Sequence, residues 1–280
     1  MIISVASGKG GTGKTTVAVN LALCLEQAQL LDCDVEEPNA QIFLKANICD
    51  RKPATVRVPE IDYGKCNFCG TCRDVCAYHA FALLPKKVLF FPQMCHGCGA
   101  CSRLCPQGTI REIDRPIGEI EIGQRNDIRF IQGKLTVGET MAPPLIRQVK
   151  SHIDPSLTAI IDAPPGTACP MVTAVKDSDF CILVTEPTPF GMNDLQLAIE
   201  TVQKLGIPYG VVMNRAEPDD LRTRLYFKAH DIPVLLKIPF DRKIAELYSV
   251  GIPFIEQFPE YRTKFQELFR FILDSTKVVA

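Results

Sequence analysis

Eight of the 13 cysteines in this 280-residue chain lie between residues 66 and 105, in two runs of identical spacing. The runs are Cys66-x2-Cys69-x2-Cys72-x3-Cys76 and Cys95-x2-Cys98-x2-Cys101-x3-Cys105-Pro106. Two-residue gaps let a chain wrap tightly around one face of a metal cluster, and thiolate sulfur is the soft ligand that iron–sulfur clusters select. The spacing therefore predicts iron–sulfur chemistry with all eight cysteines as ligands.

Two other chemistries use clustered cysteines. A disulfide scaffold needs an oxidising compartment, whereas this chain opens on a buried-strand pattern without the charged and apolar regions of a secretion signal. Two zinc sites of four cysteines each are the other alternative, although zinc motifs usually pair two C-x2-C units around a longer gap. We favour two [4Fe–4S] clusters over zinc and expect a cytoplasmic protein.

A second group of residues with chemically meaningful spacing lies near the start of the chain. Residues 2–6 read as a short buried strand, and an apolar helix begins near residue 14. Between and across them runs the sequence Gly8-Lys9-Gly10-Gly11-Thr12-Gly13-Lys14-Thr15-Thr16. Strand, G-x-x-x-x-G-K-[ST] and helix form the context of a phosphate-binding loop, whose backbone N–H groups converge on phosphate oxygens. We expect Lys14 to bind the β- and γ-phosphates of ATP and Thr15 to bind Mg²⁺.

The cysteine spacing resembles that of the bacterial two-cluster ferredoxins, in which the fourth cysteine of each run binds the other cluster. The resemblance implies two ligand sets. One is Cys66, Cys69, Cys72 and Cys105, and the other is Cys95, Cys98, Cys101 and Cys76. The first run lacks the proline that follows its last cysteine in the motif, and this small departure leaves the implied ligands unchanged.

The extra Lys9 makes the phosphate loop resemble the deviant Walker A loop of the MinD/ParA/nitrogenase-iron-protein superfamily. Residues 30–39 resemble its switch I segment, residues 160–166 its Walker B strand and switch II, and residues 211–215 the strand with a base-recognising asparagine. Together with the cysteine runs, essentially the whole chain resembles MinD-superfamily ATPases that contain an inserted ferredoxin domain.

This resemblance implies a role for each matching residue. Lys9 reaches across a dimer interface to the partner's nucleotide, Asp34 positions or deprotonates the attacking water, and Asp162 holds Mg²⁺ through water. Asn214 and the loop around Pro239 contact adenine, although Asn214 also fits as the cap of a turn. Phosphoryl transfer needs positioning and charge neutralisation, which these groups supply. The implied catalytic set is Lys9, Lys14, Asp34 and Asp162.

The elements that must position these residues alternate along the chain. Strand signals occur at 2–6, 28–32, 157–161, 179–185, 208–213 and 233–238, and helix patterns at 14–27, 143–152, 170–177, 191–205, 218–230 and 241–250. Continuously apolar strands alternating with helices predict an α/β fold with a mostly parallel sheet covered on both faces. Residues 117–137 read as antiparallel strands flanking that sheet.

The cysteine runs interrupt the ATPase pattern rather than precede it. We therefore predict a discontinuous ATPase domain of residues 1–58 and 113–280, with an inserted α+β ferredoxin domain of residues 59–112. The insert follows the switch I segment, and switch segments move when the γ-phosphate leaves. We hypothesise that the nucleotide state alters the position or exposure of the clusters.

Composition argues against two classes of partner. A net charge of −1 with 22% charged residues gives no electrostatic reason to expect nucleic acid. No apolar stretch approaches the roughly 18 residues of a membrane span. The C-terminal segment 259–274 carries an apolar stripe of Phe265, Leu268, Phe269, Ile272 and Leu273. We expect this stripe to dock on the sheet rather than on a membrane.

These features lead to a functional hypothesis with two alternatives. We expect an ATP-dependent homodimer that couples ATP hydrolysis to electron transfer from two [4Fe–4S] clusters to a redox enzyme. The alternatives are a carrier or assembly factor for metal cofactors and a spatial-organising ATPase with a redox-sensing insert. Cys169 matches the spacing of a cluster ligand in the nitrogenase iron protein, but it lacks a second cysteine. We therefore expect Cys169 to be an ordinary buried thiol.

Overall fold

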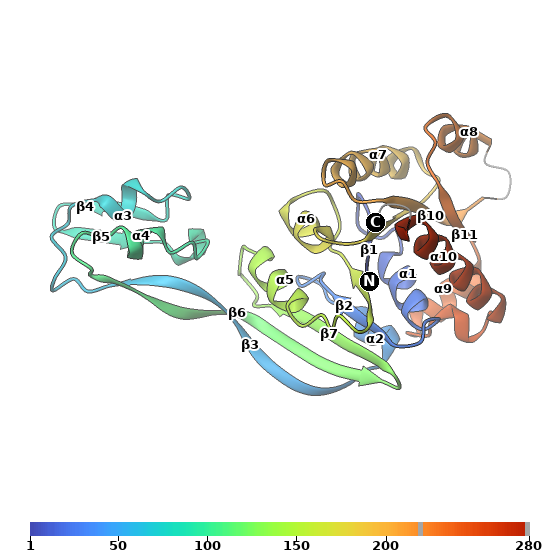
Figure 1. Ribbon diagram of the computed structural model, residues 1–280, viewed down its shortest axis with the longest axis horizontal. Helices are drawn as coiled ribbons and strands as arrows, with labels where there is room; N and C mark the ends of the chain where they lie inside the picture. The colour runs from blue at the N-terminus through green and yellow to red at the C-terminus, as the bar shows by residue number, and fades with distance from the viewer. Residues whose placement is uncertain (218–220, 278–280) are drawn as a thin grey trace.

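A computed structural model describes residues 1–217 and 221–277 of the chain (Figure 1). Its strands are β1 (Ile2–Ala6), β2 (Ala28–Asp32), β3 (Asn47–Ile61), β4 (Phe81–Leu84), β5 (Lys87–Phe90), β6 (Ile110–Arg125), β7 (Ile128–Leu135), β8 (Thr158–Asp162), β9 (Phe180–Thr185), β10 (Tyr209–Ala216) and β11 (Val234–Pro239). Within these residues a nine-stranded sheet has the order β11-β10-β9-β1-β8-β2-β7-β6-β3. The pairs from β11 to β7 are parallel, whereas β6 runs antiparallel to both β7 and β3.

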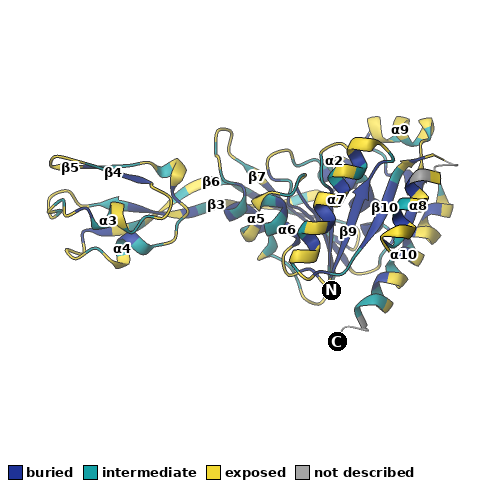
Figure 2. Cartoon of the chain, turned by 90° about the horizontal axis from the view of Figure 1, so that it is seen from above, coloured by how far each residue is buried: buried dark blue, intermediate teal, exposed yellow. Residues whose placement is uncertain are grey.

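The described residues also form helices. They are α1 (Lys14–Ala22), α2 (Ala40–Leu44), α3 (Thr71–Asp74), α4 (Ala100–Arg103), α5 (Pro143–Lys150), α6 (Cys169–Val175), α7 (Pro189–Lys204), α8 (Leu221–Ala229), α9 (Arg242–Ser249) and α10 (Pro259–Lys277), with short 3-10 turns η1 (Pro92–Met94) and η2 (Phe254–Glu256). Helices α5, α6 and α7 pack on one face, and α1, α2 and α10 pack on the other. Figure 2 shows the buried strands lying between these helices.

The apolar strands are buried on both sides because successive residues point to opposite faces. Leu30 and Ile160 pack with the α1 and α10 side, while their neighbours Leu31 and Ile161 pack with the α5 and α6 side. The predicted α/β architecture with a mostly parallel sheet is therefore confirmed. Each predicted strand is present within one residue at its start.

Two helix predictions need comment. Helix α1 ends at Ala22 rather than at residue 27, because the chain must turn before β2 begins at Ala28. Gln27 makes that turn with a left-handed φ of 53°. Helix α8 begins at Leu221, and the first three residues of the predicted helix, 218–220, lie outside the described residues.

Strand β3 was not expected from the sequence, and strand β6 begins at Ile110 rather than at residue 117. They continue past the sheet as a two-stranded antiparallel ribbon, paired from Asn47 and Gln124 to Ile61 and Ile110. At the far end of the ribbon lies a small lobe with the β4–β5 hairpin, α3 and α4 (Figure 1). The boundaries expected at 58/59 and 112/113 fall inside the ribbon, where Val58 pairs with Ile113.

The terminal helix α10 docks on the sheet side that also carries α1, as expected from its apolar stripe. Phe265, Leu268 and Ile272 are buried in that core, and Arg262 donates a hydrogen bond to the carbonyl of Leu23. Among residues 1–217 and 221–277, none of the helices has the length and apolar character needed to cross a membrane.

Candidate functional site

The phosphate loop runs from the end of β1 into the first turn of α1. Gly11 and Gly13 have φ values of +77° and +94°, which side chains with a Cβ rarely adopt. A Cβ on Gly8 would fall 2.0 Å from the backbone oxygen of Asp194 at the start of the neighbouring helix α7. The loop conformation therefore requires glycine at these positions, as the motif predicts.

A cavity of about 350 Å³ opens above this loop, at the carboxyl ends of the parallel strands. Most of the predicted nucleotide-binding residues line it. They are Gly10, Gly11, Gly13, Lys14, Thr15, Thr16, Asp34, Asn214 and Pro239. Gly8, Lys9, Thr12 and Asp162 do not line it. Phe240 belongs to the loop around Pro239 that was expected to contact adenine, and it lines the cavity as well. The sequence analysis missed Ile244 and Tyr248, whose apolar surfaces complete the wall beside Pro239.

Asp162 ends β8 directly beneath the phosphate loop and is fully buried. Burial raises its pKa to about 7, the Thr15 hydroxyl and Lys14 lower it, and Asp34 raises it again. Neither carboxylate oxygen has a well-placed hydrogen-bond partner in the described protein. A buried carboxylate without partners, beside the Thr15 hydroxyl, fits the oxygen donor set that Mg²⁺ prefers.

Asp34 lines the cavity and belongs to the segment that follows β2. Burial raises its pKa to about 6, while Lys14 lowers it and Glu37 and Glu36 raise it. A carboxyl group near Lys14 with a pKa close to neutrality suits a group that accepts a proton or orients a water. This position is compatible with the role expected for Asp34.

Asp32 is a site residue that the sequence analysis did not single out. Its carboxylate accepts hydrogen bonds from the backbone N–H groups of Asp34, Asn39 and Ala40, at 2.9 to 3.1 Å. Burial and the neighbouring Asp162 raise its pKa well above the usual range. Asp32 therefore fixes the backbone of the switch I segment. Its place as the last residue of an apolar strand, two residues before Asp34, was the available signal.

Asn214 occupies the end of β10, on the wall of the cavity. Its side-chain amide donates to the carbonyl of Thr12 at 2.9 Å, and a Cβ on Gly13 would lie 2.4 Å from the same nitrogen. Asn214 thus ties the phosphate loop to β10. Contact with a base remains a prediction.

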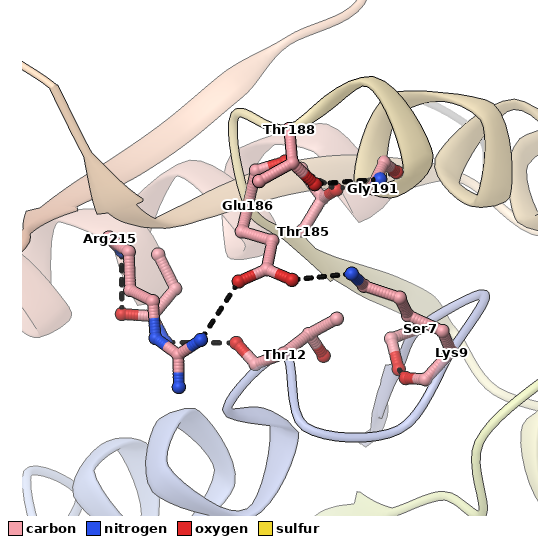
Figure 3. A network of polar contacts seen from close by, with 9 residues as sticks. Ser7, Lys9, Thr12, Thr185, Glu186, Thr188, Gly191 and Arg215 are labelled. Atoms are coloured by element: carbon pink, nitrogen blue, oxygen red, sulfur yellow. Dashed lines mark hydrogen bonds and ion pairs between the residues drawn. The ribbon is translucent and has the colours of Figure 1, made fainter.

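Lys9 lies outside the cavity and forms an ion pair within its own chain. Its Nζ is 2.5 Å from Oε1 of Glu186, which also contacts Arg215 (Figure 3). Glu186 follows β9 and was not foreseen, because the motif gives no information about the turn that brings it to Lys9.

The eight motif cysteines line two hollows in the lobe. One hollow is lined by Cys95, Cys98, Cys101 and Cys76, and the other by Cys66, Cys69, Cys72 and Cys105. Each hollow thus combines three cysteines of one run with the last cysteine of the other. These are the two sets that the ferredoxin resemblance implies.

The cysteines that share a hollow also affect the pKa values of one another's thiols. Burial raises the pKa of Cys95, and Cys98 and Cys76 add to that rise. The Thr71 hydroxyl lowers the pKa of Cys69, and Cys105 opposes that effect. Cys76 of the first run is therefore close to Cys95 of the second, and Cys105 of the second run is close to Cys69 of the first.

The hollows are built by backbone as well as by sulfur. A Cβ on Gly97 would fall 2.8 Å from Val56 and 2.9 Å from the carbonyl of Arg57, so the loop lies against the ribbon. Across the described residues, no three His, Cys, Asp or Glu side chains meet at one point as a single metal ion requires. Each thiolate of a [4Fe–4S] cluster binds a different iron, so its ligands surround a hollow instead.

Cys169 differs from the expectation. It begins α6 and is exposed, so the prediction of a buried thiol is wrong. The residue follows the Pro164–Ala168 segment at the carboxyl end of β8, and a loop in that place projects from the sheet instead of entering the core.

These features define a P-loop nucleoside triphosphatase. A glycine-rich loop joins β1 to α1 of a parallel sheet, Lys14 lines the cavity, and a carboxylate ends β8. The chain belongs to the CobQ/CobB/MinD/ParA nucleotide binding domain family, whose sequence profile matches residues 3–254. It is accordingly a nucleotide-binding ATPase of the MinD/ParA type.

Individual proteins show the same relationship. An uncharacterized protein of Methanocaldococcus jannaschii is 32% identical over 280 residues, which cover 98% of this chain and 98% of that protein. An iron-sulfur cluster carrier protein of Pyrococcus horikoshii is 26% identical over 274 residues, which cover 90% of this chain and 78% of that protein. The structure of the septum site-determining protein MinD complexed with Mg-ADP, also from Pyrococcus horikoshii, has a TM-score of 0.57 at 21% identity, covering 95% of this chain and 93% of that one. At this identity the structural likeness shows the fold.

Proposed function

We propose that this protein is a cytoplasmic Mg-ATPase in which nucleotide-dependent dimerisation is coupled to electron transfer from two [4Fe–4S] clusters to a partner redox protein. The observation that carries the proposal is the crossed arrangement of the cysteine runs around two hollows. Four thiolates for each cluster make a fully ligated group suited to repeated electron transfer. The lobe, residues 59–112, would then be the inserted ferredoxin domain.

The ATPase half of the proposal uses groups that line one cavity, together with Asp162, which is buried next to the Thr15 hydroxyl rather than on the cavity wall. Lys14 and the backbone of the phosphate loop bind phosphate oxygens, while Thr15 and Asp162 hold Mg²⁺, which neutralises charge on those oxygens. Asp34, which lines the same cavity near Lys14, orients the attacking water. Phe240 and Tyr248 offer flat surfaces for a base. A structure with the same fold, that of MinD from Pyrococcus horikoshii, is a complex with Mg-ADP, which supports the choice of Mg-nucleotide as the ligand.

Switch I is linked to the base of the lobe through β7 and the loop that follows it. The carbonyl of Val35, next to Asp34, accepts a hydrogen bond from the N–H of Leu135 at the end of β7, at 2.8 Å. The loop that follows β7 carries Glu139, which forms an ion pair with Arg115 on the ribbon. These contacts connect the nucleotide cavity to the base of the lobe.

The same loop also touches the lobe directly. The hydroxyl of Thr140 donates to the carbonyl of Gln93 at 3.2 Å, and Gln93 lies two residues before Cys95. Arg115 is near enough to Cys95 to lower the pKa of that thiol, against the larger effect of burial. Movement of switch I therefore has a physical route to the charge around one cluster.

Switch II connects to the ribbon from the other side. Lys150 at the end of α5 donates to the carbonyls of Thr173 and Ala174 in α6, the helix that follows switch II. Two residues earlier, Gln148 makes two hydrogen bonds with the backbone of Thr55 on β3. Both switches are thus linked, through the elements beside them, to the place where the ribbon leaves the sheet.

The two hollows lie at different depths along the ribbon. Arg57 and Pro59 line the hollow of Cys95, whereas Ile61 and Ile110 line the hollow of Cys66. At about 3.3 Å per residue, the Cys66 hollow lies roughly 10 Å further from the ATPase body. In the proposed function this distal cluster exchanges electrons with the partner, and the proximal cluster is the one affected by the nucleotide.

A second function is favoured by the relatives. A protein of Pyrococcus horikoshii with 26% identity is named an iron-sulfur cluster carrier protein. A carrier would release its clusters intact to an acceptor, whereas an electron-transfer protein would keep them through many redox cycles.

One experiment separates these functions. The anaerobically purified protein is reduced with dithionite and mixed with an apo-ferredoxin, with and without Mg-ATP, and iron in each protein is measured together with the cluster EPR signals. We expect reducible clusters that stay with this protein. Transfer of iron to the acceptor with matching loss from this chain would favour the carrier function and overturn the proposal.

A further inference from the structure

Glu186 lies between two cations of the same chain (Figure 3). Its Oε1 is 2.5 Å from Nζ of Lys9, and its Oε2 is 3.0 Å from a guanidinium nitrogen of Arg215. The Glu186 side chain is only 11% exposed, compared with 31% for Lys9 and 54% for Arg215. Although burial alone would raise the pKa of Glu186, the hydrogen bond and charge of Lys9, together with Arg215, hold it below its ordinary value. The carboxylate is therefore charged and bound on both oxygens.

The turn between β9 and α7 fixes the backbone of Glu186. The Thr185 hydroxyl donates to the carbonyl of Gly191, and the Thr188 side chain accepts from the Gly191 N–H, each at 3.0 Å. A Cβ on Gly191 would lie 2.5 Å from the Glu186 carbonyl oxygen. This close packing leaves Glu186 little freedom to follow Lys9 if the lysine moves.

The backbone of Lys9 is fixed as well, so its side chain is the part that can change partner. The Ser7 hydroxyl donates to the Lys9 carbonyl at 2.6 Å, and Gly8 is pressed against the backbone of Asp194. Lys14 faces the nucleotide cavity of its own chain, whereas Lys9 is directed along the surface toward Glu186 (Figure 3).

We propose that Glu186 is a positioning residue that restrains Lys9 in the nucleotide-free chain, and that ATP-dependent dimerisation requires Lys9 to leave it for the partner's phosphates. The inference rests on the proposed function, in which Lys9 contacts the nucleotide of a second copy of this chain. The ammonium group of Lys9 cannot form close ion pairs at the same time with the fixed carboxylate of Glu186 and with a phosphate of the partner's nucleotide.

The second cation makes this exchange feasible. When Lys9 leaves, Glu186 keeps the ion pair with Arg215 and is not left as a buried charge without a partner, which would be costly. Arg215 also lines the nucleotide cavity. A nucleotide that enters the cavity therefore meets the residue that shares Glu186 with Lys9.

The test compares Glu186→Gln with the wild-type full-length chain by analytical ultracentrifugation in a titration with Mg-ATPγS. Glutamine keeps the shape of the side chain and removes the charge that holds Lys9. We expect the nucleotide concentration for half-maximal dimerisation to fall roughly fivefold, the upper end of the range for a partly exposed ion pair. Affinity of the monomer for Mg-ADP, where Lys9 has no role, should stay unchanged.

Two further variants isolate the contact. In Lys9→Ala/Glu186→Gln, dimerisation should equal that of Lys9→Ala, because the restraint acts only through Lys9. Glu256→Gln removes the same charge from an ion pair with Arg125 outside the site, and it should behave as the wild type. If Glu186→Gln is poorly folded by thermal melting, Glu186→Asp shortens the contact without removing its charge and should show a smaller shift in the same direction.

The outcomes separate the inference from the proposed function. Wild-type chain that stays monomeric at saturating Mg-ATPγS would overturn both. Wild-type dimers with unchanged or weaker dimerisation in Glu186→Gln would overturn the restraint alone, since Glu186 would then be neutral toward Lys9 or would orient it productively.

Discussion

Gln148 on α5 pairs with the backbone of Thr55 on β3 through both ends of its side-chain amide. Its Nε2 donates to the Thr55 carbonyl at 3.0 Å, and its Oε1 accepts from the Thr55 N–H at 3.3 Å. The ladder between β3 and β6 shifts register between Ala54 and Thr55, where the ribbon begins to leave the body. A side chain of the ATPase body thus replaces regular strand pairing at the base of the arm that carries the cysteines.

Gln148→Ala should weaken the link between the nucleotide and the clusters. Loss of two hydrogen bonds at a half-buried site should lower the free energy of unfolding by about 1 to 2 kcal/mol and increase hydrogen exchange at Thr55. The difference in cluster potential between the ADP and ATP states should shrink, as measured by anaerobic redox titration. Gln196→Ala, on an exposed face of α7, is the matched control. A full nucleotide-dependent difference in Gln148→Ala would exclude this residue from the coupling.

The ribbon shows why the sequence predicted the sheet better than the arm. No strand was predicted around Pro53 and Pro59, and proline cannot donate to a strand ladder. Strand β3 is the edge of the sheet, so both prolines are accommodated within one continuous strand paired with β6. The parallel strands carried a stronger signal, because burial on both faces makes every residue apolar.

The residues of the candidate site also fall into those that the sequence predicts and those that it does not. The phosphate loop and the cysteine runs could be predicted because their chemistry fixes local spacing, and the structure gathers nine of the predicted nucleotide-binding residues around one cavity. Glu186 and Gln148 could not, because their contacts depend on how distant elements pack. Asp32 was missed for another reason: at the end of an apolar strand, a buried carboxylate has no partner visible in the sequence.

Cys76→Ser should damage the cluster of the second cysteine run rather than its own. Cys76 lines the hollow of Cys95, and Ala80 donates a backbone hydrogen bond to its sulfur at 3.3 Å. We expect anaerobic wild-type protein to contain about eight irons per chain and the variant to lose signal from the proximal cluster. Cys49→Ser, outside both hollows, should retain all the iron. Loss of the distal cluster alone would reverse the assignment, and stoichiometric zinc without iron would refute the iron–sulfur proposal.

Lys14→Ala and Asp34→Ala should separate nucleotide binding from turnover. Without Lys14 the phosphate charge lacks its local partner, so Mg-ATP binding measured by calorimetry should be lost. Asp34→Ala should still bind Mg-ATP while kcat falls by roughly 10²- to 10⁴-fold, the range for loss of a general base. Lys204→Ala at the exposed end of α7 controls for loss of a lysine. Wild-type kcat in Asp34→Ala would remove Asp34 from the reaction.

Glu139→Gln should raise the reduction potential of the proximal cluster and leave the distal cluster nearly unchanged. The Glu139 side chain is 5% exposed and neutralises Arg115, which lies near Cys95. Without that carboxylate, the positive charge of Arg115 favours the added electron. A rise of about 30 mV corresponds to about 0.7 kcal/mol for one electron. Redox titration followed by EPR resolves the two clusters, so the distal cluster serves as the internal control. Equal shifts in both clusters would indicate a general change of the lobe, and no shift in either would mean that the ATPase loop does not act on cluster charge.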